Sequence, residues 1–240
     1  MPIRLLAAVL FFLVCSQPVL AECYRIATSA GTGATGEIAQ ITRHVFATAG
    51  LCVETVRVPV RRIDMMLAER QVDGWVQAVD GKVLPSDGIF FLARDLGHLE
   101  GTLYWSPEDP EPQGGKVSIG TVTGVSWALE EIRNRGGRLF EVNDNKQLLS
   151  MVVNRRIRGF LLPEITYRHF LVRFPRLSNY HSRTVIDLSI RVALRADLKP
   201  LAAKLEAAIG QTLEERFPDQ VWQRYLEELG VPGVKASGSW

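Results

Sequence analysis

The chain has 240 residues, of which 47% are hydrophobic and 22% are charged, a composition typical of a folded globular protein. Its 28 Lys and Arg residues are nearly balanced by 26 Asp and Glu residues, and the formal net charge is +2. This balance excludes a polybasic nucleic-acid-binding protein and an acidic disordered chain.

Residues 1–21 have the pattern of a secretory signal peptide. Arg4 precedes an apolar run from Leu5 to Val14, and Val19-Leu20-Ala21 has the small residue that a cleavage site requires. The apolar run is shorter than the roughly 20 residues that a transmembrane helix needs. We therefore expect an exported, periplasmic protein whose mature chain begins at Glu22.

Two cysteines, Cys23 and Cys52, follow this signal. Each begins an apolar strand pattern, so both would lie at the same end of neighbouring parallel strands, where a disulfide is geometrically possible. An oxidising compartment favours this bridge over two free thiols. Because the four histidines show no metal-binding spacing, we expect no metal and no cofactor.

The first part of the mature chain alternates strand and helix patterns. A strand pattern over Tyr24–Thr28 leads through a Gly/Ser/Thr loop into a helix from about Glu37 to Ala49, which ends at Gly50. A strand follows over Val53–Val58. Residues 61–76 then predict an amphipathic helix and a short apolar strand.

The loop Gly31–Gly36 matches G-x-G-x-x-G between a strand and a helix, which is the context of a dinucleotide-binding site. However, Glu54 is the only acidic residue near the spacing required for ribose, and it lies early in its strand. We prefer the interpretation that the loop and its helix-start amides hold an anionic group of a smaller ligand. The candidate side chains are those of Ser29, Thr32 and Thr35; a turn that binds nothing remains a third interpretation.

The same order of elements returns in the second half. Residues 146–161 repeat the pattern of 61–76, with Gly159 in the place of Gly74. The elements upstream also correspond: a strand over 116–120, a helix over about 127–134 and a strand over 139–142. The repeat predicts two βαβαβ units, each with parallel strands covered by helices.

The segments that join the two units predict a hinge. Residues 101–105 have a strand pattern, and 106–115 (SPEDPEPQGG) are typical of a surface linker. Another strand pattern, over 188–194, precedes amphipathic helices over 197–209 and about 218–229. If these helices pack on the first unit, the chain crosses between two lobes twice. The expected domains are a signal peptide (1–21), lobe 1 (22–102 and 191–230), lobe 2 (103–190) and a tail (231–240).

This order of elements resembles that of the family 3 solute-binding proteins, the periplasmic receptors best known for delivering amino acids to ABC importers. The similarity covers nearly all of the mature chain, through the segments CYRIAT, VPVRRIDMMLAERQVDGWV, GGKVSIGTVTGVSW, NDNKQLLSMVVNRRIRGFLL and IRVALRADLKPLAAKLEAAI. The resemblance implies a two-lobed α/β fold, in which a double-crossover hinge lets the lobes close on a ligand.

The resemblance also implies binding residues, although the chain departs from the family pattern. Arg94 is the nearest candidate for the arginine that holds a ligand carboxylate. In the family a pair of adjacent threonines usually lies at the start of the first helix of lobe 2. Thr121 and Thr123 lie there in this chain, but Gly124 stands where the second adjacent threonine is expected. Glu164 is the closest equivalent of the aspartate that holds the ligand's amino group.

The residues themselves suggest further candidates, because open parallel sheets bind ligands at the carboxyl ends of their strands. In lobe 1 this places Arg61 at the cleft, where it begins a helix. A cation opposes the dipole at that position, which favours a binding role over a stabilising one. In lobe 2 the same argument adds Ser126 and Trp127; Trp127 would stack on a ligand or simply pack.

We expect a monomeric receptor that closes around a small polar or anionic, amino-acid-like solute and binds no nucleic acid. Its partner would be an ABC permease or a membrane sensor. Two alternatives remain open. The scaffold also resembles a few periplasmic dehydratases, for which Glu164 would be the general acid, and the chain would otherwise be a partner-binding module without a ligand.

Overall fold

The computed structural model describes residues 23–29, 35–80, 87–115 and 117–230. The predicted signal peptide, Thr32 and the predicted tail lie outside these residues. Within the described part of the chain, none of the helices has the length and apolar character needed to cross a membrane.

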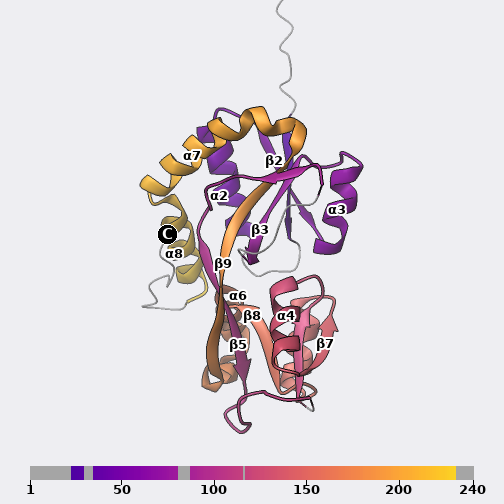
Figure 1. The fold of residues 1–240 in the computed structure, drawn as a ribbon. Helices are drawn as coiled ribbons and strands as arrows, with labels where there is room; N and C mark the ends of the chain where they lie inside the picture. The colour runs from indigo at the N-terminus through magenta and orange to yellow at the C-terminus, as the bar shows by residue number, and fades with distance from the viewer. Residues whose placement is uncertain (1–22, 30–34, 81–86, 116, 231–240) are drawn as a thin grey trace, which may run out of the picture.

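The chain folds into two α/β lobes, which lie one above the other in Figure 1. Lobe 1 combines elements from both ends of the chain. Its elements are β1 (Tyr24–Ser29), α2 (Thr35–Thr48), β2 (Val53–Val58), α3 (Val60–Ala68), β3 (Gly74–Asp80), β4 (Ile89–Phe91), the 3-10 helix η2 (Ala196–Leu201), α7 (Ala202–Glu214) and α8 (Phe217–Glu228).

Lobe 2 is formed by the middle of the chain and repeats the same alternation. Its elements are β6 (Ser118–Val122), α4 (Ser126–Asn134), β7 (Arg138–Val142), α5 (Asn145–Val153), β8 (Gly159–Pro163), α6 (Glu164–Arg173) and the 3-10 helix η1 (Pro175–Asn179). The predicted repeat is therefore confirmed, with α6 and η1 as elements that the sequence pattern did not predict.

Two long strands, β5 (His98–Trp105) and β9 (His181–Arg195), carry the chain between the lobes. They pair with each other in antiparallel fashion. At one end β9 pairs with β3 of lobe 1, and at the other β5 pairs with β8 of lobe 2. The strands of both lobes therefore form one hydrogen-bonded sheet, in the order β2-β1-β3-β9-β5-β8-β6-β7, and β4 pairs with β9. The register of the β5–β9 pair shifts between Gly101 and Thr102, which marks a bulge at the hinge.

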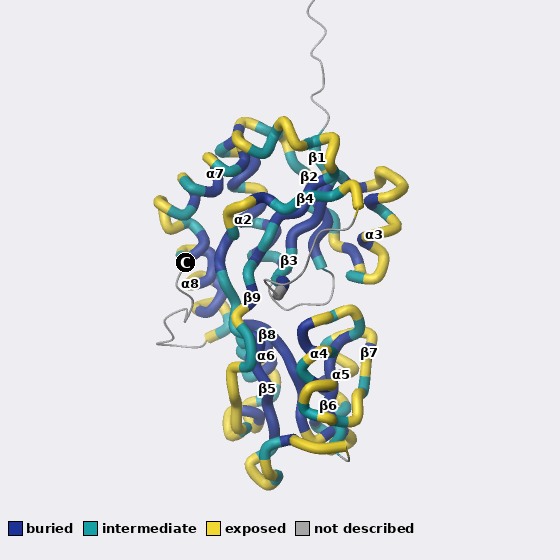
Figure 2. Tube along the Cα trace, in the orientation of Figure 1, coloured by how far each residue is buried: buried dark blue, intermediate teal, exposed yellow. Residues whose placement is uncertain are grey.

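Within each lobe the strands of the βαβαβ unit are parallel, as the pattern predicts: β1 pairs with β2 and β3, and β6 pairs with β7 and β8. In lobe 1, β3 and β4 also pair with β9 in antiparallel fashion. Each lobe buries apolar side chains in separate clusters on the two faces of its sheet. The buried residues are dark blue in Figure 2. In lobe 1, Phe46 and Trp222 pack on one face and Ile63 on the other. In lobe 2, Leu148 and Ile119 belong to two separate clusters. Each such side chain contributes about 1.5–3 kcal/mol by its burial.

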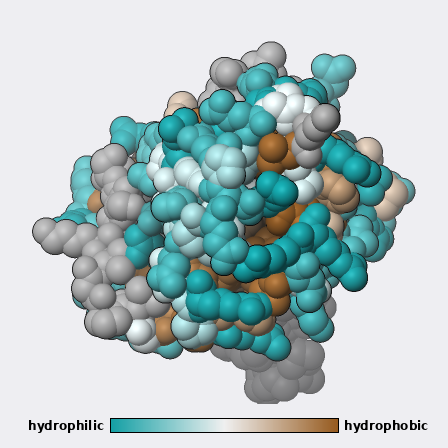
Figure 3. Space-filling view, turned by 90° about the horizontal axis from the view of Figure 1, so that it is seen from below, coloured by the Kyte–Doolittle hydropathy of each residue, from teal (hydrophilic) through white to brown (hydrophobic). Residues whose placement is uncertain are grey.

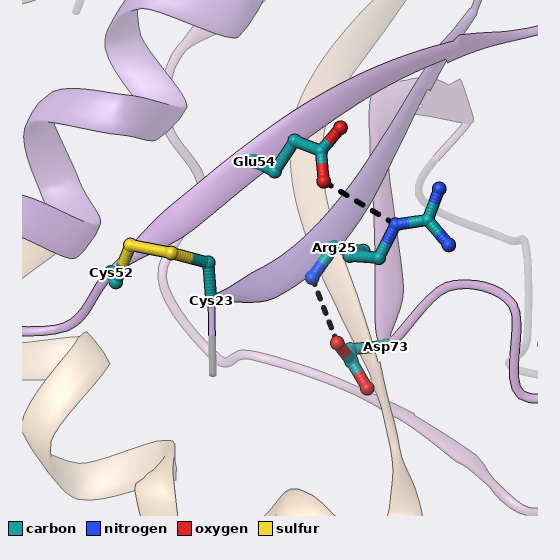
Figure 4. The surroundings of a disulfide bond; sticks show 5 residues. All are labelled: Cys23, Arg25, Cys52, Glu54 and Asp73. Atoms are coloured by element: carbon teal, nitrogen blue, oxygen red, sulfur yellow. Dashed lines mark hydrogen bonds and ion pairs between the residues drawn. A yellow bond between two sulfur atoms is a disulfide. The ribbon is translucent and has the colours of Figure 1, made fainter. Parts of the chain in front are cut away.

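A disulfide joins Cys23 to Cys52 at the amino ends of β1 and β2, with the two Cα atoms 4.5 Å apart (Figure 4). Beside it, the backbone N–H of Arg25 donates to the carboxylate of Asp73 at 2.8 Å. The Nε atom of Arg25 lies 3.5 Å from the carboxylate of Glu54. The disulfide and these polar contacts hold the strands together at the end away from their carboxyl termini.

Lobe 2 has a polar far end. Seen from that end, most of the surface is hydrophilic, and hydrophobic residues show in smaller patches between polar ones (Figure 3). The linker predicted over 106–115 lies against this lobe through ion pairs between its acidic residues and arginines: Glu108 with Arg155, Asp109 with Arg158, and Glu111 with Arg135 and Arg183. The linker is therefore attached to lobe 2 along its length.

Candidate ligand-binding cavity between the lobes

A cavity of about 450 Å³ lies between the two lobes. Its wall contains the carboxyl ends of β1 and β3 and the first turns of α2 and α3 from lobe 1. From lobe 2 come the carboxyl ends of β6 and β8, the loop after β7 and the first turns of α4, α5 and α6. These ends meet because each parallel strand leads into its helix at the same edge of the sheet. The volume lies within the roughly 300–1,000 Å³ typical of small-molecule sites.

Most of the predicted site residues meet in this wall: Ser29, Thr35, Arg61, Thr123, Ser126 and Trp127. They come from both lobes. The hydroxyl of Thr35 donates to the carbonyl oxygen of Ser29 at 2.7 Å and so fixes the start of α2 against β1. The hydroxyl of Thr123 donates to the carbonyl oxygen of Val142 at 3.1 Å and joins the loops after β6 and β7.

Arg94 lies elsewhere, although the resemblance implied that it would hold a carboxylate. Its side chain lies against Gly210 of α7, and its backbone N–H donates to the carboxylate of Glu206 at 3.0 Å. Arg94 is exposed and is not part of the cavity wall. The segment that leads into the hinge therefore directs this arginine outward, along the helical face of lobe 1.

Thr121 and Glu164 also lie outside the wall, although their neighbours line it. Thr121 is fully buried, and its hydroxyl faces the carbonyl oxygen of Leu161 at 3.5 Å. Glu164 is the first residue of α6 rather than part of a strand, and its carboxylate pairs with Arg168 one turn later, at 2.5 Å.

The wall contains polar residues that the sequence analysis missed: Thr28, Gln77, Asn143, Asp144, Asn145 and Thr166. Asp144 is the N-cap of α5, and its Oδ1 atom accepts the backbone N–H of Gln147 at 2.7 Å. The side chain of Gln147 accepts the N–H of Asn143 at 3.0 Å. The D-x-x-Q spacing of a capping box was therefore a signal for this helix start.

The rest of the wall is mainly apolar, and it carries little charge. Among the lining residues that the structure describes, Arg61 and Asp144 are the only charged ones. Three helices begin in the wall without a side-chain cap: α3 after Pro59, α4 after Val125 and α6 after Pro163. Uncapped first-turn N–H groups and the positive end of the helix dipole favour an anionic group.

Gly124, in the loop after β6, brings lobe 2 against lobe 1. A β-carbon on this residue would lie 3.3 Å from the Cβ atom of Val60, at the start of α3. Its φ angle is +88°, a conformation that glycine adopts without strain and that a threonine would not. The departure from the family's threonine pair therefore has a physical reason in this chain.

The dinucleotide interpretation of the glycine-rich loop required Glu54 to bind a ribose, and the structure does not place Glu54 at the cavity. Glu54 lies near the disulfide and pairs with Arg25 (Figure 4). It is near the amino end of β2 and does not line the cavity. In the described part of the chain, His, Cys, Asp and Glu residues form no group of three or more that could hold a metal ion.

No family model and no curated protein sequence matches this chain. Solved structures do resemble it. The GluR0 ligand-binding core in complex with L-glutamate is 15% identical, with a TM-score of 0.72 over 86% of this chain and 99% of that one. The arginine-, lysine-, histidine-binding protein ArtJ from Geobacillus stearothermophilus is 11% identical, with a TM-score of 0.69 over 87% and 100%.

A third solved structure is the ancestral amino-acid-binding protein AncCDT-1, a precursor of cyclohexadienyl dehydratase. It is 12% identical, with a TM-score of 0.69 over 85% of this chain and 94% of that one. At these identities the comparisons show the fold alone. The chain therefore has the two-lobed α/β fold of these amino-acid-binding proteins, as the order of its sequence elements predicted.

Proposed function

We propose that this protein is a periplasmic solute-binding receptor whose two lobes close on a small molecule. The observation that carries the proposal is the cavity of about 450 Å³, whose wall is built from both lobes. A ligand there would touch both lobes only when they come together, so binding would favour the closed arrangement. The strands β5 and β9, with a bulge at Gly101, would serve as the hinge.

The similar solved structures support this proposal, because they are structures of proteins that bind amino acids. We also propose lobe boundaries after residues 102 and 190, a division supported by the position of both residues in the crossing strands β5 and β9. We further propose that the closed form of a monomer is recognised by an ABC permease or a membrane sensor, with no role for nucleic acid.

The dehydratase alternative depended on Glu164 as a general acid opposite Arg61. The carboxylate of Glu164 pairs with Arg168 and lies outside the cavity wall. Asp144, the carboxylate that does line the cavity, caps α5. Glu164 therefore does not have the position of an acid facing a substrate, and Asp144 is engaged as the cap of α5 through the N–H of Gln147. No second function is proposed.

Trp127 provides a direct test, because it lines the cavity and is 5% exposed. Purified protein is titrated with amino acids and organic acids while tryptophan fluorescence and the melting temperature are recorded. We expect at least one compound to change both signals saturably, to be recovered unchanged, and to reduce the radius of gyration in small-angle X-ray scattering. In the control Trp127→Phe, the thermal shift should persist and most of the fluorescence change should disappear. Absence of saturable binding across the panel would contradict the proposal, and consumption of the ligand would indicate an enzyme.

A further inference from the structure

The charge of the cavity wall distinguishes between classes of ligand. An α-amino acid carries an ammonium and a carboxylate, and a buried ammonium needs a carboxylate partner to offset the loss of its hydration. The described wall offers one carboxylate, Asp144, and its Oδ1 atom already accepts the N–H of Gln147. The wall is therefore poorly suited to a buried ammonium group.

The same wall is better suited to a carboxylate than to an ammonium group. Arg61 supplies a cation, and the uncapped starts of α3 and α4 supply first-turn N–H groups from both lobes, whereas α6 already has the carboxylate of Glu164 in its first turn. An anion at these helix ends gains from hydrogen bonds and from the helix dipoles. Electrostatics thus favours a single negative charge on the ligand.

Two buried hydroxyls in the wall supply an independent observation. Thr28 of β1 is 1% exposed and Thr166 of α6 is 0% exposed, and both line the cavity. Neither hydroxyl oxygen has a hydrogen-bond partner among the described residues. A buried hydroxyl without a partner lowers stability, and a ligand oxygen that bonds to it would remove this cost. The two hydroxyls come from different lobes, so a ligand that bonds to both would link the lobes.

Large apolar side chains occupy the remaining wall, including Ile38, Val76, Leu99, Leu161 and Ile165. They offer no hydrogen bonds, and they favour an aliphatic or aromatic body on the ligand. The wall thus combines a subsite for one anionic group, hydroxyls that can bond to a neutral oxygen, and an apolar chamber.

We infer that the ligand is a monocarboxylic acid with an apolar body that carries a hydroxyl or keto oxygen in place of an ammonium group. The carboxylate lies at Arg61 and the helix starts, and the neutral oxygen bonds to Thr28 and Thr166. This inference rests on the proposed receptor function and specifies its substrate class.

Matched compounds test the inference by calorimetric titration of the full-length mature protein. One set is leucine, 2-hydroxy-4-methylpentanoate and 4-methylpentanoate; the other is phenylalanine, 3-phenyllactate and 3-phenylpropionate. Within a set only the group beside the carboxylate changes. We expect the hydroxy acid of at least one set to bind at least about tenfold more tightly than its amino acid. The inference is overturned if either amino acid binds more tightly than its hydroxy acid, or if neither hydroxy acid binds.

Threonine-to-valine variants test the hydroxyls, because valine keeps the shape and removes the oxygen. Thr28→Val and Thr166→Val should each weaken hydroxy-acid binding about fivefold to tenfold and leave binding of the acid without the hydroxyl unchanged. Thr212→Val is the matched control, since Thr212 of α7 is also 0% exposed with an unpartnered hydroxyl but lies outside the wall. It should change neither affinity. Equal effects on both acids would contradict the assigned role of the hydroxyls.

The variant Asp144→Asn gives a second test of the ligand class, and asparagine is also a good N-cap residue for α5. We expect it to improve hydroxy-acid affinity, because it removes a negative charge that faces the same cavity as the ligand's carboxylate; a tenfold loss would overturn the inference. If an amino acid binds and the hydroxy acids do not, the ligand class is wrong while the receptor function stands. If no compound of the wider panel binds saturably either, the receptor function fails as well.

Discussion

Gly124 of lobe 2 and Val60 of lobe 1 approach each other so closely that a β-carbon on the glycine would lie 3.3 Å from the Cβ atom of the valine. Both residues line the cavity. The left-handed backbone of Gly124 thus lets the loop after β6 reach the first turn of α3 without a side chain between them. Approach of the two lobes at this point depends on the size of residue 124.

We therefore predict that Gly124→Ala affects both stability and binding. The left-handed conformation should cost about 1–2 kcal/mol of unfolding free energy, and the added methyl group should separate the lobes and weaken ligand binding. Gly136→Ala is the matched control, because Gly136 has a φ of +64° but no neighbour within 4 Å of a β-carbon. It should lower stability in urea unfolding without changing affinity. Unchanged affinity in Gly124→Ala would show that the contact with Val60 does not limit closure.

Arg61 lines the cavity, whereas Arg62 beside it does not. If Arg61 holds the ligand's negative charge, Arg61→Ala should weaken binding at least about tenfold, or by about 1.4 kcal/mol. The loss should shrink as salt rises, because Arg61 is exposed and its charge is screened. Arg62→Ala should change affinity little. Equal affinities of the Arg61 variant and the unmodified protein in calorimetry would remove Arg61 from the site.

The alternation of strands and helices was predictable because each element carries its own local signals. Gly50, predicted as a helix stop, has a φ angle of +60°, as a left-handed helix end requires. The helix α6 was missed because it follows Pro163 directly and lacks a regular apolar stripe. The strand β9 was predicted from residue 188 but begins at His181, because its first residues are mostly exposed and pair only with β5.

The site was predictable where it depends on strand ends and not where it depends on how the lobes face each other. Ser29 and Thr123 directly follow or end strands, and both line the cavity. Thr28 and Gln77 lie within strands, and whether they reach a ligand depends on how the two lobes are placed relative to each other. The hydrophobic pattern of the sequence does not reveal that placement. Thr166 was missed with its helix. Arg94 was proposed from the family pattern, and its segment takes it to α7 instead.

The disulfide should affect stability and not binding. It closes a loop with a sequence separation of 29 and joins the amino ends of β1 and β2, away from the cavity. The double variant Cys23→Ser, Cys52→Ser should lose roughly 3 kcal/mol of unfolding free energy, mainly because the unfolded chain gains freedom. Urea unfolding with and without reductant measures the loss, and reductant should leave the double variant unchanged. A large fall in ligand affinity would show that the disulfide also shapes the site.

Glu37 of α2 should make stability depend on pH. Burial raises the pKa of its carboxyl above the ordinary 4.5, and Glu228 of α8 raises it further, while its own backbone N–H, Arg57 and His169 oppose the shift. The native protein therefore binds more protons than the unfolded chain between pH 4.5 and the raised pKa. Stability from this group is present below pH 4.5 and is lost as pH rises through the raised pKa.

Replacing Glu37 with Gln removes this titration while keeping the size and polarity of the side chain. We expect Glu37→Gln to be more stable than the unmodified protein near pH 7 and the two to converge as pH falls toward 4.5. Glu228→Gln should give a smaller change in the same direction, because it removes only the repulsion. Urea unfolding at several pH values measures the difference between the proteins, in which contributions from unrelated groups cancel. If Glu37→Gln and the unmodified protein differ by the same amount at every pH, the carboxyl of Glu37 does not titrate with a raised pKa in the folded protein.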